Sequence, residues 1–290
     1  MLVRLESGAA CACVDRRGGE LRSWFAGGRE LIWHGDPVWW DQSAPILFPI
    51  VGWASGGQIR VDGSVRPMPV HGFARQHTFA LSSCDSGSVK LTLASNQETQ
   101  KVYPFRFQLS VSYVLASSSL TVNFSIENLD RRSIPYALGF HPAFRWPFND
   151  VPRHKYRIRF EAEEDPLVPE VTPNGLISAR RIVLPLKCRT LDLADELFAS
   201  DAICFLNARS RLFSLGAGSS GSSITLEAAG FPHLALWSLP GAPFVSMETW
   251  TGHSDPEGFT GDLFEKPSMR ILVPGETADH CVRMSFRAAE

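Results

Sequence analysis

Apolar and polar residues alternate with a period of two along much of this chain. Residues 107–113 read Phe-Gln-Leu-Ser-Val-Ser-Tyr, and residues 120–126 read Leu-Thr-Val-Asn-Phe-Ser-Ile. Successive side chains of an extended strand point to opposite faces, so this pattern is typical of strands with one buried and one polar face. The sequence therefore predicts two such strands, joined by a turn near residues 116–119.

The rest of the chain favours the same fold class. The period of two returns at 89–93, 234–237 and 282–286, whereas no twelve-residue segment has a convincing helical stripe. The 23 glycines and 20 prolines suit turns between many short strands, as in a sandwich or a barrel. We expect an all-β protein with little helix and a single domain over residues 1–290. The segments 161–165 and 216–223 are predicted to be exposed loops.

Composition disfavours several classes of partner. The 28 Lys and Arg residues nearly balance the 30 Asp and Glu residues, and neither sign forms a long block. Nucleic acid and anionic membranes are therefore poor candidates. The first eight residues meet a charge and a turn signal before any apolar core of a signal peptide, and no run of eighteen apolar residues occurs. We expect an unexported, cytoplasmic protein.

The six cysteines are too sparse for a disulfide scaffold, and most lie next to apolar residues. We expect reduced and mostly buried thiols. Cys11 and Cys13 have no second pair at zinc-site spacing, and residues two apart on a strand share one face. No metal site is predicted.

A carboxylate interrupts the apolar run 244–250, which otherwise indicates a strand. Glu248 shares its predicted face with Ser246 and Trp250. An aromatic ring beside a carboxylate is a common arrangement for sugar binding, because the ring covers an apolar sugar face while the carboxylate binds a hydroxyl. The alternative is a salt bridge between Glu248 and a nearby arginine.

Two histidines, far apart in the sequence, are candidate partners of Glu248. In a strand through 136–141, His141 shares its face with Ala137 and Gly139, which would leave space for a ligand beside the imidazole. His71 precedes a glycine and suits the rim of a cavity, and Arg75 would lie on its side of an extended chain. Each histidine has a structural alternative, a satisfied core residue for His141 and a turn residue for His71.

Several of these motifs occur in the order seen in the aldose 1-epimerase (galactose mutarotase) family. They are Pro-Ile-Leu-Phe-Pro-Ile-Val-Gly at 45–52, His-Gly-Phe-Ala-Arg at 71–75, Gly-Phe-His-Pro at 139–142 and Met-Glu-Thr-Trp at 247–250. With further likenesses at 28–33 and 266–276, the chain most resembles the LacX-like branch. The resemblance implies a large antiparallel β-sandwich of the galactose mutarotase type, with a cleft for an aldose and no cofactor.

The resemblance also implies roles for individual residues. His141 matches the general acid that protonates the ring oxygen, and Glu248 the general base that takes the proton of the anomeric hydroxyl. His71 matches a second cleft histidine that binds the sugar, and Asp201 a substrate-holding aspartate. Trp53 stands where relatives usually carry a substrate-contacting arginine. We expect either that Trp53 stacks on the sugar or that Arg75 or Arg60 supplies the missing charge, and we expect Trp250 to contact the sugar as well.

Three other functions remain open at this point. A non-catalytic carbohydrate-binding or sugar-sensing protein would suit the abundant tryptophans and the lost arginine. A glycosidase would need a second carboxylate, for which Asp255 and Asp262 are candidates. A metal-dependent jelly-roll enzyme is disfavoured because His71 and His77 are six residues apart.

Overall fold

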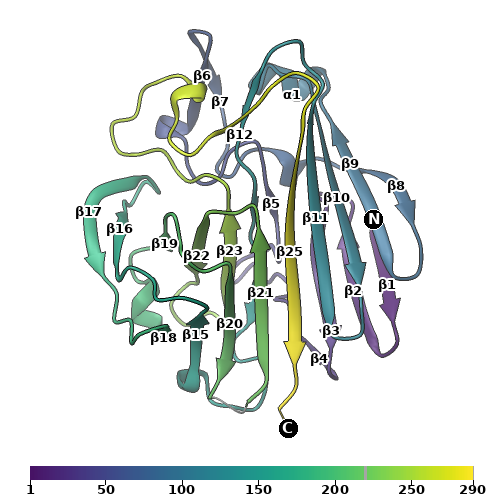
Figure 1. Cartoon of the computed structure of the whole chain (residues 1–290), viewed down its shortest axis with the longest axis vertical. Coiled ribbons are helices and arrows are strands. Elements are labelled where there is room, and N and C mark those ends of the chain that lie inside the picture. Colours follow the sequence, from purple (N-terminus) through teal and green to yellow (C-terminus); the bar gives the residue numbers. More distant parts are fainter. Residues whose placement is uncertain (219–220, 290) are drawn as a thin grey trace.

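The computed structural model describes residues 1–218 and 221–289, and its sheets stack face to face in two layers (Figure 1). One layer is a nine-stranded antiparallel sheet in the order β18-β15-β20-β21-β25-β11-β10-β9-β8. In chain order its strands are β8 Ala80–Cys84, β9 Ser88–Ala94, β10 Phe107–Leu115, β11 Ser119–Asn128, β15 Tyr156–Phe160, β18 Thr190–Asp192, β20 Leu212–Ala217, β21 Ser223–Ala229 and β25 Thr277–Arg287.

The other layer consists of a four-stranded sheet and a six-stranded sheet. The four-stranded sheet holds β1 Leu2–Ser7, β2 Ala10–Asp15, β3 Glu20–Ala26 and β4 Arg29–Glu30. The six-stranded sheet runs β19-β22-β23-β13-β5, with β14 paired to β23. Its strands are β5 Ile46–Leu47, β13 Gly139–Phe140, β14 Ala143–Arg145, β19 Ile203–Phe205, β22 His233–Trp237 and β23 Phe244–Trp250.

Alternation explains how the two layers meet. The apolar residues of β10 and β11 point inward, and Phe124 of β11 contacts Phe140 of β13 with 5.7 Å between the ring centroids. Removing these large aromatic surfaces from water drives the layers together. The predicted all-β fold is confirmed, as are the two strands and the turn between them.

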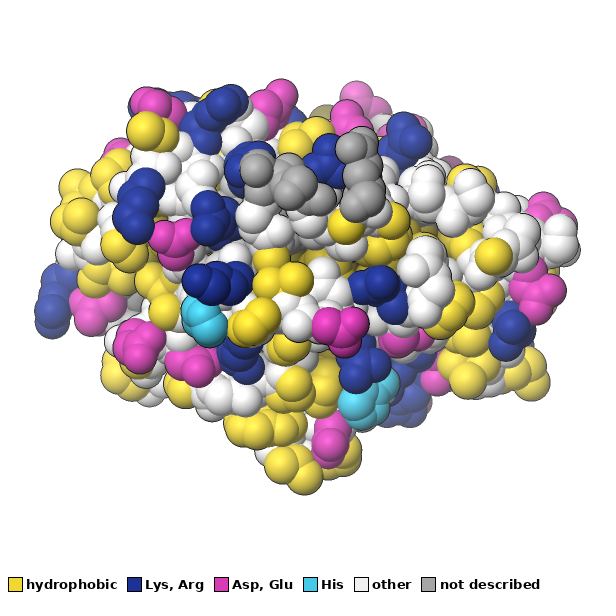
Figure 2. Space-filling model, turned by 90° about the horizontal axis from the view of Figure 1, so that it is seen from below, with side chains coloured by type: hydrophobic (Ala, Val, Ile, Leu, Met, Phe, Trp, Pro, Cys, Tyr) yellow, Lys and Arg dark blue, Asp and Glu magenta, His cyan; other side chains and the backbone are white. Residues whose placement is uncertain are grey.

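Short elements connect the sheets. Three strand pairs lie outside the main layers: β6 Gln58–Val61 with β7 Ser64–Pro67, β12 Ile134–Tyr136 with β24 Arg270–Leu272, and β16 Leu167–Val171 with β17 Ile177–Val183. The described helices are α1 Gln97–Val102 and the 3₁₀ turns η1 Ser55–Gly57, η2 Ala74–Gln76, η3 Arg153–Lys155, η4 Asp195–Phe198 and η5 Leu263–Glu265. None of these helices has the length and hydropathy needed to cross a bilayer. The face seen in Figure 2 carries interspersed positive and negative side chains.

Segment 161–165 is an irregular, mostly exposed loop as predicted, although Glu164 within it is buried and its carboxylate accepts hydrogen bonds from the backbone N–H groups of Arg209 and Ser210. Two other predictions need correction. Segment 216–223 includes the end of β20 and the start of β21, while Ser219 and Ser220 lie outside the described residues. The thiols are all free, but only Cys204 is fully buried.

Candidate active site

A cleft of about 560 Å³ opens beside the six-stranded sheet, and every predicted site residue except Arg60 lines it. Arg60 lies in β6, away from this cleft, so it does not supply the missing charge there. The strand β23 contributes Glu248 and Trp250, and the segment after β13 contributes His141. The turn η2 contributes Arg75, and loops contribute Trp53, His71 and Asp201. The fold thus brings together side chains that are up to about two hundred residues apart in the sequence.

Glu248 lies at the bottom of the cleft with 1% of its surface exposed. Its Oε1 atom is 3.1 Å from Nε2 of His141, and its Oε2 atom accepts a hydrogen bond of 3.0 Å from the indole N–H of Trp250. No arginine pairs with this carboxylate among the described residues, so the salt-bridge alternative is wrong. Burial raises the pKa of Glu248 well above its ordinary value, and Asp201 adds to this, whereas the Trp250 hydrogen bond opposes it.

His141 is packed between Trp40 and Trp237, with ring centroids 5.0 and 5.7 Å away. Its backbone N–H donates to the carbonyl of Pro45, which fixes the residue beside β5. Burial lowers the pKa of His141 to about 3, with the charge of Arg75 acting in the same direction. Burial thus opposes ionisation of both members of the Glu248–His141 pair, which favours one proton shared between them at neutral pH.

The space beside His141 has a different origin from the one predicted. Residues 136–141 do not form one strand, since β12 ends at Tyr136 and β13 begins at Gly139. A Cβ at Gly139 would fall 2.8 Å from Leu47, so this glycine permits close packing against β5. The cleft is lined instead by Trp40 and Trp237.

His71 is held by the turn at residues 49–52. Its backbone N–H donates to the carbonyl of Gly52, and its Nδ1 accepts from the N–H of Gly52 at 3.1 Å. A neutral ring with Nδ1 as acceptor carries its proton on Nε2. Gly72 follows with a φ of +71°, and any Cβ there would lie 2.2 Å from the carbonyl oxygen of Phe48. The His-Gly pair is therefore needed to pack this turn against β5.

The His71 ring lies 5.7 Å from that of His141, at right angles to it. Burial is the main cause of its lowered pKa, and repulsion from His141 and Arg75 contributes. A neutral His71 keeps its Nε2–H as a hydrogen-bond donor for a ligand in the cleft.

Arg75 lines the cleft from an element that the sequence did not predict. It belongs to η2 rather than to an extended strand. Its guanidinium donates to the side chain of Gln42 at 3.2 Å and to the carbonyl of Val70 at 3.0 Å. This places a cation in the cleft wall, although the usual arginine position is occupied by Trp53.

Trp53 and Asp201 complete the rim. Trp53 is 43% exposed and packs over Gly175, in the connection between β16 and β17. Asp201 has a φ of +135°, and its carboxylate accepts from the N–H of Ala202. Burial raises the pKa of Asp201. The roles of these residues in sugar binding stay predictions.

Several residues that line the cleft were not identified by sequence reasoning, among them Gln42, Cys204 and Trp237. Trp237 ends the alternating run 234–237, which forms β22, and lies opposite Ser246 of β23. The alternation of β22 could therefore have indicated which of its side chains face the same side as Ser246 and Glu248. Gln42 and Cys204 carry no comparable signal, because only the folded chain brings them to the cleft.

The carboxylates considered for a glycosidase lie elsewhere. Asp255 is buried against the ammonium of Lys266 and accepts from the N–H of Ser55. Asp262 caps the turn η5. Neither lines the cleft that holds Glu248.

Comparison with known proteins identifies the family. Residues 1–284 match the family model described as aldose 1-epimerase. The plasmid-encoded protein LacX of Lactococcus lactis subsp. lactis is 32% identical over 266 residues, which is 87% of each chain. The crystal structure of a galactose mutarotase-like protein from Lactobacillus casei ATCC 334 superimposes with a TM-score of 0.92 at 30% identity, covering 99% of this chain and 100% of that one.

A galactose mutarotase related enzyme from Lactobacillus acidophilus gives the same TM-score of 0.92 at 25% identity, over 100% of this chain and 98% of the other. The fold, the order of the motifs and the family match over nearly the whole length lead to one conclusion. The chain belongs to the aldose 1-epimerase family.

Proposed function

We propose that this protein is a mutarotase, an isomerase that interconverts the α and β anomers of an aldose without a cofactor. The observation that carries the proposal is the buried Glu248–His141 pair, 3.1 Å apart at the bottom of a sugar-sized cleft beside His71. Family membership supports a sugar as the substrate class. The free thiols suit a reducing compartment such as the cytoplasm.

The reaction begins with one proton shared by the pair. Transfer of this proton from Glu248 to His141 creates a carboxylate base and an imidazolium acid. His141 then protonates the ring oxygen while Glu248 removes the proton of the anomeric hydroxyl, and the C1–O bond opens to the aldehyde. Rotation about C1–C2 exposes the other carbonyl face. Ring closure runs the two transfers in reverse, which restores the carboxylate and the imidazolium, and return of the proton from His141 to Glu248 completes the cycle.

His71 has a supporting role in this scheme. Its Nε2–H stabilises the negative charge that develops on the ring oxygen before His141 delivers its proton. General acid and base assistance of this kind is worth about 10² to 10⁴ in rate. The uncatalysed reaction already proceeds slowly in water, so acceleration of that size is readily measured.

Replacing Glu248 tests the proposal. In Glu248→Gln the amide cannot act as a base, so we expect mutarotation no faster than in buffer while sugar binding remains measurable. Polarimetry on a freshly dissolved pure anomer reports the rate, and isothermal titration reports binding. Glu227→Gln on the exposed face of β21 is the matched control and should keep full activity. An unchanged rate in Glu248→Gln would exclude Glu248 as the base.

A non-catalytic sugar-binding protein is the second candidate. It is favoured by one observation, the replacement of the usual arginine by Trp53 at the rim of the cleft. Such a protein would bind aldoses without changing the rate at which anomers equilibrate. The same polarimetry and titration on the unmodified protein distinguish the two functions.

A further inference from the structure

Two cysteines lie next to each other on the outer face of the four-stranded sheet. In β2 the side chains of Ala10, Ala12 and Val14 point into the core, while those of Cys11 and Cys13, at the alternate positions, point outward and are partly exposed. The strand β2 is paired with β1 on one side and with β3 on the other. The backbone that carries the two thiols is therefore fixed from both sides.

The spacing of the two thiols suits a bridging atom better than a direct bond. Residues two apart on an extended strand are about 6.4–6.8 Å from each other, and their side chains are nearly parallel. A disulfide needs Cβ atoms about 3.5–4.5 Å apart, so the strand geometry disfavours one, and Cys11 and Cys13 are both free thiols. Two metal–sulfur bonds of about 2.3 Å form a linear unit about 4.6 Å long, which matches this spacing.

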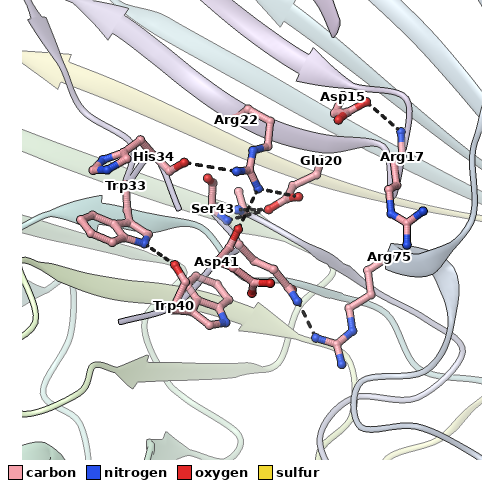
Figure 3. Close-up of polar contacts among 12 residues, drawn as sticks. Asp15, Arg17, Glu20, Arg22, Trp33, His34, Trp40, Asp41, Ser43 and Arg75 are labelled. Atoms are coloured by element: carbon pink, nitrogen blue, oxygen red, sulfur yellow. Dashed lines mark hydrogen bonds and ion pairs between the residues drawn. The ribbon is translucent and has the colours of Figure 1, made fainter. Parts of the chain in front are cut away.

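The carboxylates at the edges of this face are already engaged. Asp15, the next outward-pointing residue of β2, accepts from the backbone N–H of Arg17 and pairs with the N-terminal ammonium at 2.8 Å. Glu20 pairs with Arg22 at 3.1 Å. Figure 3 shows the contacts of Asp15 with Arg17 and of Glu20 with Arg22. Glu30 accepts from a hydroxyl and from two backbone N–H groups.

A third ligand is missing on this face. Within residues 1–218 and 221–289, no three side chains of His, Cys, Asp or Glu are grouped so that they could hold a metal ion. Zinc in structural sites almost always has four ligands, and magnesium and calcium need several oxygen ligands. Two thiols alone therefore favour a soft ion that is stable with two sulfur ligands in a line, as Cu(I) is.

The neighbouring strands provide a suitable environment for such an ion. Arg4 lies opposite Cys13 in the register of β1 and β2, and its pairing with Glu6 at 2.7 Å holds the guanidinium on this face. Two thiolates and one monovalent cation carry a single negative charge, which the guanidinium partly offsets. Phe25, opposite Cys11 on β3, is partly buried and adds apolar surface.

The protonation state of Cys13 also bears on binding. Burial, with a contribution from the neighbouring Cys11, raises the pKa of Cys13, while the charge of Arg4 opposes this rise. A metal ion that binds here must therefore displace the proton of Cys13.

We propose that Cys11 and Cys13 bind one Cu(I) ion in a two-coordinate site on the outer face of β2. Each thiol releases its proton to water as its Cu–S bond forms, and copper stays Cu(I), so the step needs no oxidant or reductant. The site is independent of the proposed mutarotase function, because neither cysteine lines the cleft. Free thiols and Cu(I) are both favoured in a reducing compartment.

Competition with the chelator bicinchoninate tests the proposal. Reduced protein is added under nitrogen to the coloured Cu(I)–bicinchoninate complex, and the loss of visible absorbance reports transfer of the metal. We expect one equivalent of Cu(I) to move to each chain. Cys11→Ser and Cys13→Ser should each weaken binding by about 100-fold or more, since the second thiolate of a linked pair acts at high effective concentration.

Cys84→Ser and Cys188→Ser are the matched controls. Each removes an exposed thiol that has no cysteine two residues away, so both variants should keep the affinity of the unmodified protein. Alkylation by iodoacetamide gives a second measurement, which needs no variant. One equivalent of Cu(I) should protect Cys11 and Cys13 together and leave Cys84 reactive, as mass spectrometry of the peptides will report.

Three outcomes would overturn the site. The first is that the protein takes no Cu(I) from bicinchoninate. The second is that the control variants lose as much affinity as Cys11→Ser and Cys13→Ser. The third is that Zn(II) protects the two thiols from alkylation as well as Cu(I) does, because a two-coordinate site should discriminate against an ion that prefers four ligands. None of these outcomes bears on mutarotation, which polarimetry measures separately.

Discussion

At the scale of single residues, the indole of Trp250 contacts Glu248 in addition to the sugar contact predicted for it. Its N–H is bonded to Oε2 of Glu248, which leaves Oε1 directed at His141. This hydrogen bond also counteracts part of the rise in the pKa of Glu248 that burial causes. Trp250 therefore positions the base and keeps it closer to ionisation.

Trp250→Phe retains an aromatic ring and removes only this donor. We expect kcat to fall by about 10- to 100-fold, since a hydrogen bond to a charged group is worth about 1.5–3 kcal/mol. KM should change little. The pKa of Glu248 should rise further, so the alkaline limb of the pH–rate profile should move to higher pH. Stopped-flow polarimetry across pH 5–9 measures both effects.

Trp24→Phe is the control for this change. Trp24 lies in the core, and its indole nitrogen has no partner within the described residues. This variant should keep the pH–rate profile of the unmodified protein. If Trp250→Phe raised KM and left the profile in place, Trp250 would act on the sugar rather than on Glu248.

The site residues themselves were largely predictable, but their contacts were not. Local motifs identified Glu248, His141 and His71 because each interrupts an apolar or turn pattern. The hydrogen bond from Trp250 to Glu248 joins two residues two apart on one strand. The alternation of the strand predicted that they share a face, but it did not predict that the indole N–H donates to the carboxylate. The pairing of Arg75 with Gln42 depends on the turn η2 and on a segment thirty-three residues away, so no local pattern contains it.

At the scale of elements, period-two alternation predicted β10 and β11 well because each has one face in the core and one outside. The same reasoning was less informative for β23, whose seven residues are all buried. A strand covered on both faces has no polar side to mark its parity. Segment 161–165 is a mostly exposed loop as predicted, but the burial of Glu164 was not predictable, since a buried glutamate that accepts two backbone N–H groups resembles an exposed one in the sequence.

One loop is held in place by a buried ion pair. Lys266 and Asp255 are almost fully buried, and Asp255 also accepts from the N–H of Ser55, two residues after Trp53. Lys266→Met would leave the carboxylate of Asp255 buried without its cation. We expect the free energy of unfolding to fall by about 3–5 kcal/mol, as for other broken buried pairs. Urea unfolding followed by tryptophan fluorescence measures the loss.

Lys187→Met is the comparison for this prediction. Lys187 also pairs with an aspartate, Asp192, but 77% of its side chain is exposed. An exposed pair of this kind contributes about 0–1 kcal/mol. Equal losses in the two variants would contradict the idea that burial makes the Lys266 pair important.

At the scale of the whole molecule, buried histidines couple folding to pH. Burial lowers the pKa of His233 to about 3, assisted by repulsion from His253, and it also lowers the pKa values of His253 and His280. These rings are neutral in the folded chain but titrate near their ordinary value of about 6.5 when it unfolds. Their stabilising effect is complete above that pH and is lost as the pH falls toward the folded values.

Glu248 acts in the opposite sense. Its pKa is raised in the folded chain, so the unfolded chain releases its proton first and the folded state loses stability as pH rises through the folded pKa. The proposed mutarotase activity thus requires a carboxylate whose burial costs stability at and above neutral pH, while the histidines cost stability in acid. The free energy of unfolding should therefore be greatest between the acid pH at which the buried histidines titrate and the higher pH at which Glu248 ionises in the folded chain.

His233→Asn isolates the acid side of this balance. The Nδ1 atom of His233 accepts from the N–H of Asn207, a bond that the asparagine carbonyl can replace, while Nε2 is buried without a partner among the described residues. Between pH 6.5 and 4 the unfolded chain binds one extra proton at this site. Its removal should lower the slope of unfolding free energy against pH by up to about 1.4 kcal/mol per unit.

His154→Asn, which changes an exposed ring, should leave the slope unchanged. Urea titrations at half-unit steps would contradict the assignment if both variants gave the slope of the unmodified protein, because His233 would then be protonated in the folded state as readily as in the unfolded one.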